Sequence, residues 1–391
     1  MKKNLGISAV LLLTASLVLV ACAKKEAAPA ASSGAAAGTL KIGALFPLSG
    51  SVAYYGTEEQ KGLDIAVADI NAAGGLLGQQ VKIVYEDTEG DSGKAVNAFT
   101  KLVTQDGIKL IVGPTISSES AAVAAQAQAR GILMNSPSGT AVNITDPGDY
   151  VFRACFLDPF QGTVGADFAY DTLKVKNAAV LYNAGGDYQT GLAQAFKDEF
   201  ARKGGKIVAD EAYQDGDVDF NAQITRIKAA KPDAIWLPNY YNDVLLQAKQ
   251  LRAQGVTVPL LGGDGWDSLT DNAGDEIMPG YWASGFAADT TEPKGAEFAK
   301  KYQTAYGKAA TQFAALGYDA FMLIVDACKA ANSTDPAKVK EALKNINGTY
   351  VTGNIRYDAN RNPIKPATIL EIAKADDGKL VNKFKTMVQP Q

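Results

Sequence analysis

Two serines, Ser117 and Ser118, occupy positions where they could help to bind a small anion. They follow the apolar run 110–112 and a Gly-Pro pair, and an alanine-rich segment, 121–129, comes after them. This order predicts a buried strand, a sharp turn and a helix that begins near the two hydroxyls. A helix N-terminus has free backbone N–H groups and the positive end of the helix dipole, so it can bind a carboxylate or a phosphate. The alternative is that one serine only caps the helix.

A carboxylate and several tyrosines occur in other loops that follow predicted strands. Asp264 lies in a Gly-Gly-Asp-Gly turn after the apolar segment 258–261, and these loops contain almost no lysine or arginine. A buried carboxylate needs a positive partner, whereas a phosphate ester would normally be bound by lysine or arginine. The loops therefore favour a ligand with one positive and one negative group. Asp264 could instead be only a turn residue, and Tyr55, Tyr188 and Tyr240 could be packing residues.

The composition argues against several classes of function. The 391 residues include 38 basic and 42 acidic ones, so no basic surplus suggests nucleic-acid binding. Histidine is absent, which removes the commonest general base, the serine–histidine triads and most zinc sites. The sequence also has no Walker A or G-x-G-x-x-G motif. We therefore expect a binding protein without metal or cofactor, and not an enzyme. A hydrolase that uses Ser117 is the enzymatic alternative, although an unactivated serine is a weak nucleophile.

The first 38 residues predict export from the cytoplasm. A basic start and an apolar run over 5–20 indicate a secretory signal peptide at residues 1–21. The alternative, an uncleaved membrane anchor, would need a longer apolar run. Leu-Val-Ala before Cys22 resembles a bacterial lipobox, and this resemblance implies that Cys22 is lipidated and becomes the mature N-terminus. Residues 22–38 contain no aromatic or large aliphatic side chain, so we expect a lipid-anchored, flexible tether there.

Strands and helices are predicted to alternate along the rest of the chain. Apolar runs predict strands at 40–46, 81–85, 110–112, 131–134, 178–182, 234–237 and 258–261, and helical spacing predicts helices around 63–70, 95–103, 121–129, 191–203 and 244–251. This alternation is typical of an α/β fold with parallel sheets and helices on both faces, and the length suggests two domains. In such sheets ligands bind beyond the carboxyl ends of the strands, where the polar loops described above are expected to lie.

In their order along the chain, these loops resemble the branched-chain amino-acid binding proteins of bacterial ABC importers. The resemblance covers nearly the whole chain from Leu40 onward, and no single motif in it is specific. The shared landmarks are Pro47-Leu48-Ser49-Gly50, Tyr55-Gly56, Asn71 to Gly78, Glu86-Asp87, Gly113-Pro114, Ser117-Ser118, Phe152-Arg153, Asp158, Gln161-Gly162 and Gly353 to Asp358.

The resemblance implies two doubly wound parallel-sheet lobes joined by three hinge strands, which is the type I periplasmic-binding-protein fold. Lobe 1 would comprise residues 39–154 and 287–366, and lobe 2 residues 155–286 and 367–391. A monomer outside the cytoplasm, in the periplasm or at the cell surface, would bind an aliphatic, branched-chain type L-amino acid between the lobes. It would deliver the ligand to the transmembrane subunits of an ABC permease. Relatives of the same fold suggest an aromatic acid, a γ-amino acid or a short-chain amide as the alternative ligand.

The resemblance also implies which residues bind the ligand. Groups of lobe 1 would hold its carboxylate and ammonium, an acidic residue of lobe 2 would bind the ammonium, two tyrosines of lobe 2 would close over it, and two aromatic residues would line the side-chain pocket. The groups of lobe 1 would be Ser117, Thr140 and Ser138, and the acidic residue would be Asp264. The covering tyrosines would be Tyr188 and Tyr240, and the side-chain pocket would be lined by Tyr55 and Phe313. Thr115 and Ile116 would border the side-chain pocket and could alter the ligand preference.

The two cysteines beyond the leader leave two alternatives open. Cys155 and Cys328 could form a disulfide in an oxidising compartment. They could equally be two buried, small and apolar side chains. A disulfide that some relatives have elsewhere is not expected, because the corresponding positions hold Thr88 or Glu89 and Ile116.

Overall fold

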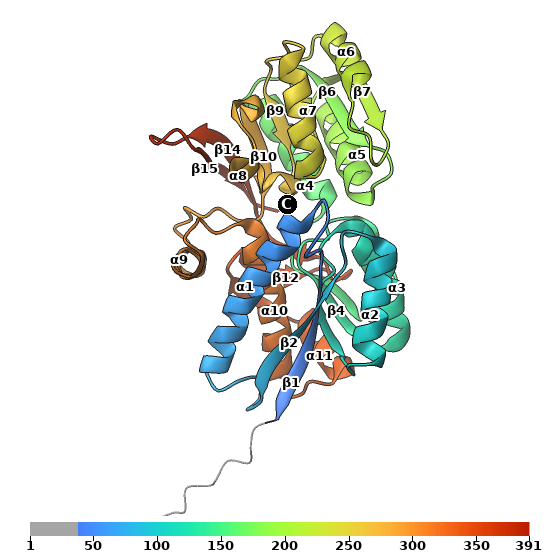
Figure 1. The fold of residues 1–391 in the computed structure, drawn as a ribbon, viewed down its shortest axis with the longest axis vertical. Coiled ribbons are helices and arrows are strands. Elements are labelled where there is room, and N and C mark those ends of the chain that lie inside the picture. The colour runs from blue at the N-terminus through green and yellow to red at the C-terminus, as the bar shows by residue number, and fades with distance from the viewer. Residues whose placement is uncertain (1–37, 391) are drawn as a thin grey trace, which may run out of the picture. The chain divides into compact units, whose positions relative to one another are not determined.

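The computed structural model describes residues 38–390, which belong to one compact unit. The predicted signal peptide, Cys22 and residues 23–37 of the predicted tether lie outside the described residues. Figure 1 shows two regions, each built around a sheet that is covered by helices. No helix within residues 38–390 is long and apolar enough to cross a membrane.

The first sheet has five parallel strands in the order β2-β1-β3-β4-β5. Its strands are β1 Thr39–Phe46, β2 Gln80–Asp87, β3 Leu110–Val112, β4 Leu133–Ser136 and β5 Val151–Arg153, and the helices that pack against it are α1 Ala53–Ala72, α2 Ser92–Thr104, α3 Ser117–Arg130, α10 Gln312–Ala331 and α11 Pro336–Lys344. We call this sheet and its helices lobe 1.

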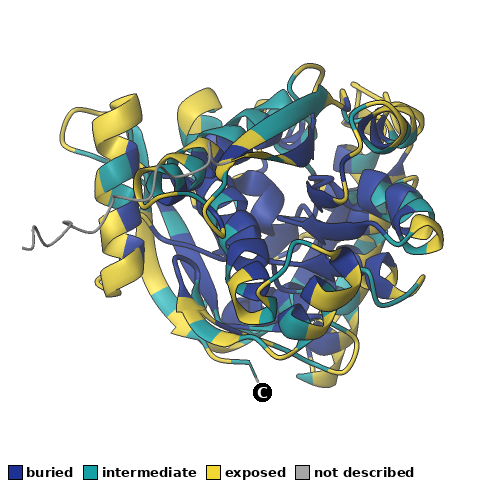
Figure 2. Ribbon diagram, turned by 90° about the horizontal axis from the view of Figure 1, so that it is seen from below, coloured by how far each residue is buried: buried dark blue, intermediate teal, exposed yellow. Residues whose placement is uncertain are grey.

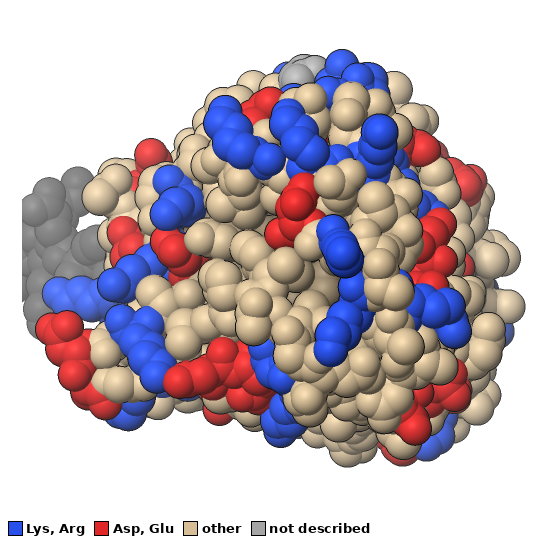
Figure 3. Space-filling model, turned by 90° about the horizontal axis from the view of Figure 1, so that it is seen from above, with Lys and Arg blue, Asp and Glu red and all other residues tan. Residues whose placement is uncertain are grey.

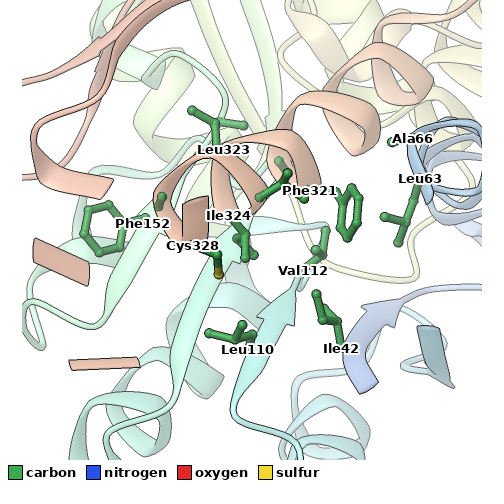
Figure 4. Packing of buried hydrophobic residues seen from close by; sticks show 14 of the residues in the cluster. Ile42, Leu63, Ala66, Leu110, Val112, Phe152, Phe321, Leu323, Ile324 and Cys328 are labelled. Carbon is green, nitrogen blue, oxygen red and sulfur yellow. The ribbon is translucent and has the colours of Figure 1, made fainter. Parts of the chain in front are cut away.

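Apolar side chains point to both faces of the sheet from β1, which explains why helices cover both faces. Successive residues of a strand point to opposite faces. Ile42 and Phe46 therefore pack with α1 and α10, whereas Leu45 packs with α2 and α3. Figure 4 shows Ile42 and neighbouring strand residues facing the apolar side chains of α10, including Phe321 and Ile324.

The two longest helices, α1 and α10, cross at a contact that only glycine permits. A Cβ atom on Gly62 would lie 1.8 Å from the carbonyl oxygen of Ala314, and one on Gly317 would lie 2.4 Å from the carbonyl oxygen of Glu59. Because both contacts are to backbone atoms, a larger side chain would push the helices apart. This close approach fixes the first turns of α1 and α10 beside each other, which matters for the site described below.

The second sheet has seven strands in the order β15-β14-β10-β9-β8-β6-β7. Its strands are β6 Asn177–Asn183, β7 Lys206–Tyr213, β8 Ala234–Trp236, β9 Leu260–Gly262, β10 Gly280–Ser284, β14 Ala367–Lys374 and β15 Leu380–Val388, and its helices are α4 Asp158–Asp167, α5 Asp187–Arg202, α6 Asn221–Ala230, α7 Tyr241–Ala253 and the short α8 Leu269–Asn272. Strands β6 to β10 are parallel, and β14 and β15 add an antiparallel edge. We call this part lobe 2.

The remaining elements lie between β10 and β14 in the sequence. Helix α9 spans Pro293–Tyr306, and a small antiparallel sheet contains β11 Asn347–Tyr350, β12 Gly353–Tyr357 and β13 Pro363–Ile364.

Short 3₁₀ turns occur elsewhere in the chain, at Val142–Thr145, Asp264–Trp266 and Asp275–Ile277, and a π-helical turn occurs at Phe168–Thr172. Figure 2 shows the buried residues concentrated in the strands and on the inward faces of the helices.

The structure confirms the predicted α/β fold with two parallel-sheet lobes, and each predicted strand and helix overlaps an observed one. Cys155 and Cys328 are both buried and are not joined by a disulfide, so the second alternative for these thiols holds. On the surface shown in Figure 3, acidic and basic side chains are interspersed.

Candidate functional site

All eight residues that the sequence analysis assigned to the ligand site line one cavity between the two lobes. The cavity is small, because the side chains that line it fill most of the space between the lobes. It is lined by Tyr55, Ser117, Ser138, Thr140, Tyr188, Tyr240, Asp264 and Phe313, together with Thr115, Ile116 and Gly265. The residues come from both lobes and are far apart in the sequence, so the fold alone brings them together.

The start of α3 lies at the cavity through Ser117, and neither serine caps the helix. The N-cap residue is Ile116, whose side chain cannot cap, and Ser117 is the first helical residue. Ser117 is buried, and its Oγ accepts the Ala141 N–H at 3.2 Å, which leaves the hydroxyl proton free to donate. The first N–H groups of α3 have no intrahelical partner. Ser118 lines a neighbouring hollow and not this cavity.

A buried glutamate behind the lobe 1 wall fixes two hydroxyls of the cavity. Ser138 Oγ donates to Glu59 Oε1 and Thr115 Oγ1 donates to Glu59 Oε2, both at 2.5 Å. Glu59 is fully buried, and this burial raises its pKa to about 8 against the opposing effect of the two hydroxyl bonds. When Glu59 is ionised, both hydroxyl protons are directed at it, and the hydroxyl oxygens are left to accept hydrogen bonds from a ligand.

The sequence analysis missed Glu59, although a signal was present. Tyr55, Glu59 and Leu63 are four residues apart, so they share one face of α1. The three side chains are buried. An acidic residue on the buried stripe of a helix needs polar partners, because an isolated buried charge is very costly. That conflict in the pattern could have identified Glu59.

Asp264 is the acidic residue of the lobe 2 wall, and it is almost fully buried. It is 4% exposed, and its Oδ1 has no hydrogen-bond partner among residues 38–390. Burial raises its pKa to about 6, while hydrogen bonds from Tyr188, Gln161 and the backbone act in the opposite direction. A buried carboxylate oxygen of this kind requires a proton or a positive partner. The cavity can therefore hold an ammonium group at this point.

Asp158, at the first position of α4, is a second buried carboxyl near Asp264. Its pKa is raised to about 8, mainly by burial and next by the charge of Asp264, and Gln161 donates to its Oδ1 at 2.9 Å. Behind it the buried Arg153 donates to the carbonyl oxygens of Gly139 and Ala141 at 2.9 and 2.7 Å, which holds the loop that carries the lobe 1 hydroxyls. In the sequence analysis Asp158 was only a landmark, because an acidic residue before a proline is ordinary at a helix start.

Aromatic rings form the rest of the cavity wall. Tyr188 and Tyr240 stack at 5.0 Å between ring centroids, and Tyr55 and Phe313 stack at 4.3 Å. The Tyr55 hydroxyl joins the lobes, because it donates to the Gly265 carbonyl oxygen at 2.6 Å and accepts the Tyr241 N–H at 3.0 Å. These rings create an apolar compartment beside the two polar walls. Within residues 38–390, no cluster of acidic residues and cysteines is arranged to bind a metal ion.

The sequence matches a family model described as periplasmic binding protein over residues 39–379. A curated relative, the Leu/Ile/Val-binding protein homolog 3 of Brucella melitensis biotype 1, is 31% identical over 360 residues, which cover 89% of this chain and 94% of the relative.

Solved structures extend this comparison to proteins with bound ligands. The branched-chain amino acid transporter substrate binding protein LivJ from Streptococcus pneumoniae, in complex with isoleucine, is 34% identical with a TM-score of 0.81, and the match covers 90% of this chain and all of that one. A solute binding protein of an ABC transporter from R. palustris, in complex with benzoate, is 25% identical with a TM-score of 0.80 and coverage of 90% and 97%. The architecture therefore accommodates both amino acids and aromatic acids in different proteins.

Proposed function

Because the chain belongs to the periplasmic binding protein family, we propose that it is the extracytoplasmic substrate-binding component of an ABC importer. Its ligand is an aliphatic L-amino acid of the branched-chain type, which it delivers to the transmembrane subunits of a permease. One observation carries this proposal: the start of α3 and the unpartnered oxygen of Asp264 face the same small cavity, which is otherwise walled by aromatic rings. A carboxylate, an ammonium and an apolar side chain match these three parts.

Each part of the ligand has a counterpart in the proposed complex. The carboxylate binds at Ser117 and the first N–H groups of α3, where the helix dipole favours negative charge. The ammonium binds between Thr140, the Ser138 backbone and Asp264. The side chain packs against Tyr55 and Phe313, and Tyr188 and Tyr240 cover the ligand. The division of these groups between two lobes makes binding and cleft closure one process, since a ligand stabilises a conformation only through contacts specific to it.

The favourable free energies of these contacts have the order of magnitude that micromolar binding requires. Micromolar affinity corresponds to about −8 kcal/mol. Hydrogen bonds to charged groups contribute roughly 1.5–3 kcal/mol each, and burial of an aliphatic side chain contributes a similar amount. Several such bonds and one buried side chain exceed the required value before the entropy cost of binding, which is several kcal/mol, is subtracted.

We also propose how the protein is attached to the membrane and where its two lobes begin and end. A signal peptide occupies residues 1–21, and a lipid on Cys22 and the tether that follows it hold a monomeric binding domain close to the membrane and its permease. Lobe 1 consists of residues 39–154 and 287–366 and lobe 2 of residues 155–286 and 367–391. The lobes move about the three segments that connect them.

The alternative ligand is a small carboxylate or amide without an α-amino group. The R. palustris relative with bound benzoate supports this alternative, because an aromatic ring would also fit between Tyr55, Phe313 and the stacked tyrosines. The buried carboxylate of Asp264 favours the amino acid, because a simple acid would leave that oxygen without a positive partner.

Calorimetric titration of the chain from Gly38 onward tests the proposed ligand class. The protein is unfolded and refolded first, so that any co-purified ligand is removed. The panel contains leucine, isoleucine, valine, alanine, phenylalanine and γ-aminobutyrate. We expect micromolar or tighter binding of the three branched aliphatic amino acids and weaker binding of alanine. Binding of none of the α-amino acids by the folded protein would contradict the proposal and favour the alternative ligands.

A further inference from the structure

Two carboxylates of lobe 2 contact lobe 1 outside the ligand cavity. Asp267, directly after the 3₁₀ turn Asp264–Trp266, accepts the backbone N–H of Phe313 at 3.4 Å. Asp271 accepts the Tyr54 hydroxyl at 3.1 Å and pairs with Lys308 at 3.3 Å. Tyr54 belongs to α1 and Phe313 to α10, which are helices of lobe 1, and Lys308 lies in the loop before α10. We call Tyr54, Asp267, Asp271, Lys308 and the start of α10 the interlobe latch.

The latch differs from the ligand site in its composition and position. Tyr54, Asp267, Asp271 and Lys308 are absent from the lining of the ligand cavity. Their contacts would break if lobe 2 moved away from α1 and α10, because both carboxylates lie between β9 and β10 of the second sheet. They therefore stabilise the closed arrangement without touching a ligand. This is the differential contact that shifts an equilibrium between open and closed states.

Opposing effects act on Asp267 at this contact. Helix α10 has 20 residues and no acidic residue in its first turn, so the positive end of its dipole favours a carboxyl group at its N-terminus. Asp267 is 5% exposed, and its burial raises its pKa to about 8, with Glu58 and Asp271 acting in the same direction and Lys308 and the Phe313 N–H opposing them. Lys308 also pairs with the buried Glu58 at 3.0 Å, which holds its ammonium between the two lobes.

We propose that Asp267 and Asp271 hold the cleft closed from outside the ligand cavity and thereby set the rate at which the ligand leaves. This inference rests on the proposed function for the role in ligand release, but the effect on cleft closure does not depend on the identity of the ligand. Both are positioning residues, since they act on the ligand only through the closed cleft. The same substitutions would leave the choice between ligands unchanged.

The first measurement is hydrogen–deuterium exchange of the full-length chain without ligand. The Tyr241 N–H is bonded to the Tyr55 hydroxyl across the cleft, and the Tyr241 ring lies 5.9 Å from that of the latch residue Tyr54, so exchange at Tyr241 reports opening of the cleft beside the latch. In the double variant Asp267→Asn/Asp271→Asn we expect exchange at Tyr241 to increase severalfold. Asp275→Asn is the matched control, because Asp275 is in the same segment but pairs with Lys374 within lobe 2. Equal exchange at Tyr241 in the double variant and wild type would overturn the proposal.

The second measurement is the release of radiolabelled L-leucine during a chase with unlabelled leucine. We expect the double variant to release leucine about tenfold faster, with little change in the association rate, because the latch contributes after the ligand has docked. Asp271→Glu, which keeps the charge, should restore most of the slow release. A wild-type chain that binds no leucine would contradict the proposed ligand, while the exchange at Tyr241 would still decide the latch. Unchanged release in a variant that does bind leucine would overturn its role in ligand release.

Discussion

The two walls of the ligand cavity have opposite electrostatic character. The lobe 1 wall presents the Ser117 hydroxyl and the first N–H groups of α3, whereas the Ser138 and Thr115 hydroxyls donate to the buried Glu59 behind it. The lobe 2 wall presents Asp264, whose Oδ1 has no partner among the described residues. One wall therefore suits an anion and the other a cation. Neither wall alone satisfies a zwitterion, so a zwitterionic ligand gains its full set of contacts only when both lobes surround it.

Removal of the lobe 2 charge should reduce the affinity for an amino acid more than any other change described here. In Asp264→Ala, the ligand ammonium would be buried without its charged partner, so we expect amino-acid affinity to fall by about 100-fold or more. Isothermal titration calorimetry with leucine measures the change. Asp275→Ala, which removes an exposed carboxylate of the same lobe, should bind as the wild type does. An affinity of Asp264→Ala within about threefold of wild type would show that this carboxylate does not hold an ammonium.

A change on the lobe 1 wall should be smaller and should have a different selectivity. Ser117→Ala removes one hydroxyl near the proposed carboxylate but leaves the N–H groups of α3, so we expect a loss of about 10- to 30-fold. The loss should be the same for leucine and for an analogue without the amino group, because both have the carboxylate. Titration of the two compounds checks this expectation. A loss confined to leucine would place the ammonium, and not the carboxylate, at Ser117.

The pH dependence of binding should sharpen the assignment of charge to the lobe 2 wall. Burial raises the pKa of Asp264 to about 6. Its charge in turn raises the pKa of the neighbouring groups Asp158, Tyr188, Tyr240, Tyr55 and Cys155. A bound ammonium requires the ionised carboxylate, so protonation of Asp264 should decrease affinity by up to tenfold per pH unit below about 6. Titrations between pH 4.5 and 8 measure this profile. The acid limb should disappear in Asp264→Asn, and a limb that persists would assign the titration to another group.

The smallest loss of affinity is expected when an uncharged hydroxyl that bonds to both walls of the cleft is removed. Tyr55→Phe keeps the stacked ring but removes the bonds to Gly265 and Tyr241 across the cleft. Both partners are neutral backbone groups, so we expect affinity for leucine to fall by only about three- to tenfold. Calorimetry and the leucine release rate measure the loss. A decrease as large as that of Asp264→Ala would mean that closure, and not charge, dominates binding.

Much of the fold could be predicted from the sequence, because the central strands are buried on both faces and read as continuous apolar runs. Strands β7 and β15 were not predicted. Each lies at an edge of the second sheet and has a mostly polar, half-exposed pattern that resembles a loop. Strand β14 was also not predicted, although its residues are mostly apolar and buried.

The site was predictable where function and local structure use the same residue types. Ser117 follows a strand and begins a helix, and Asp264 follows a strand in a glycine-rich turn, so both were visible as loop residues at strand ends. Glu59 was hidden within a long helix, and Asp158 at an ordinary helix start. Their importance comes from burial next to the cavity, which depends on how α1 and α4 pack and not on their own sequences.

We propose that the two charges of the ligand are bound by different lobes. The most direct test compares leucine with two analogues that each lack one charge. The analogues are 4-methylpentanoate, which lacks the amino group, and 3-methylbutylamine, which lacks the carboxylate. Both are titrated calorimetrically into the refolded wild-type chain at pH 7.5. We predict that each binds at least about 100-fold more weakly than leucine, because each leaves one wall of the cavity without its partner. Binding of either analogue within about threefold of leucine would contradict the assignment of one charge to each lobe.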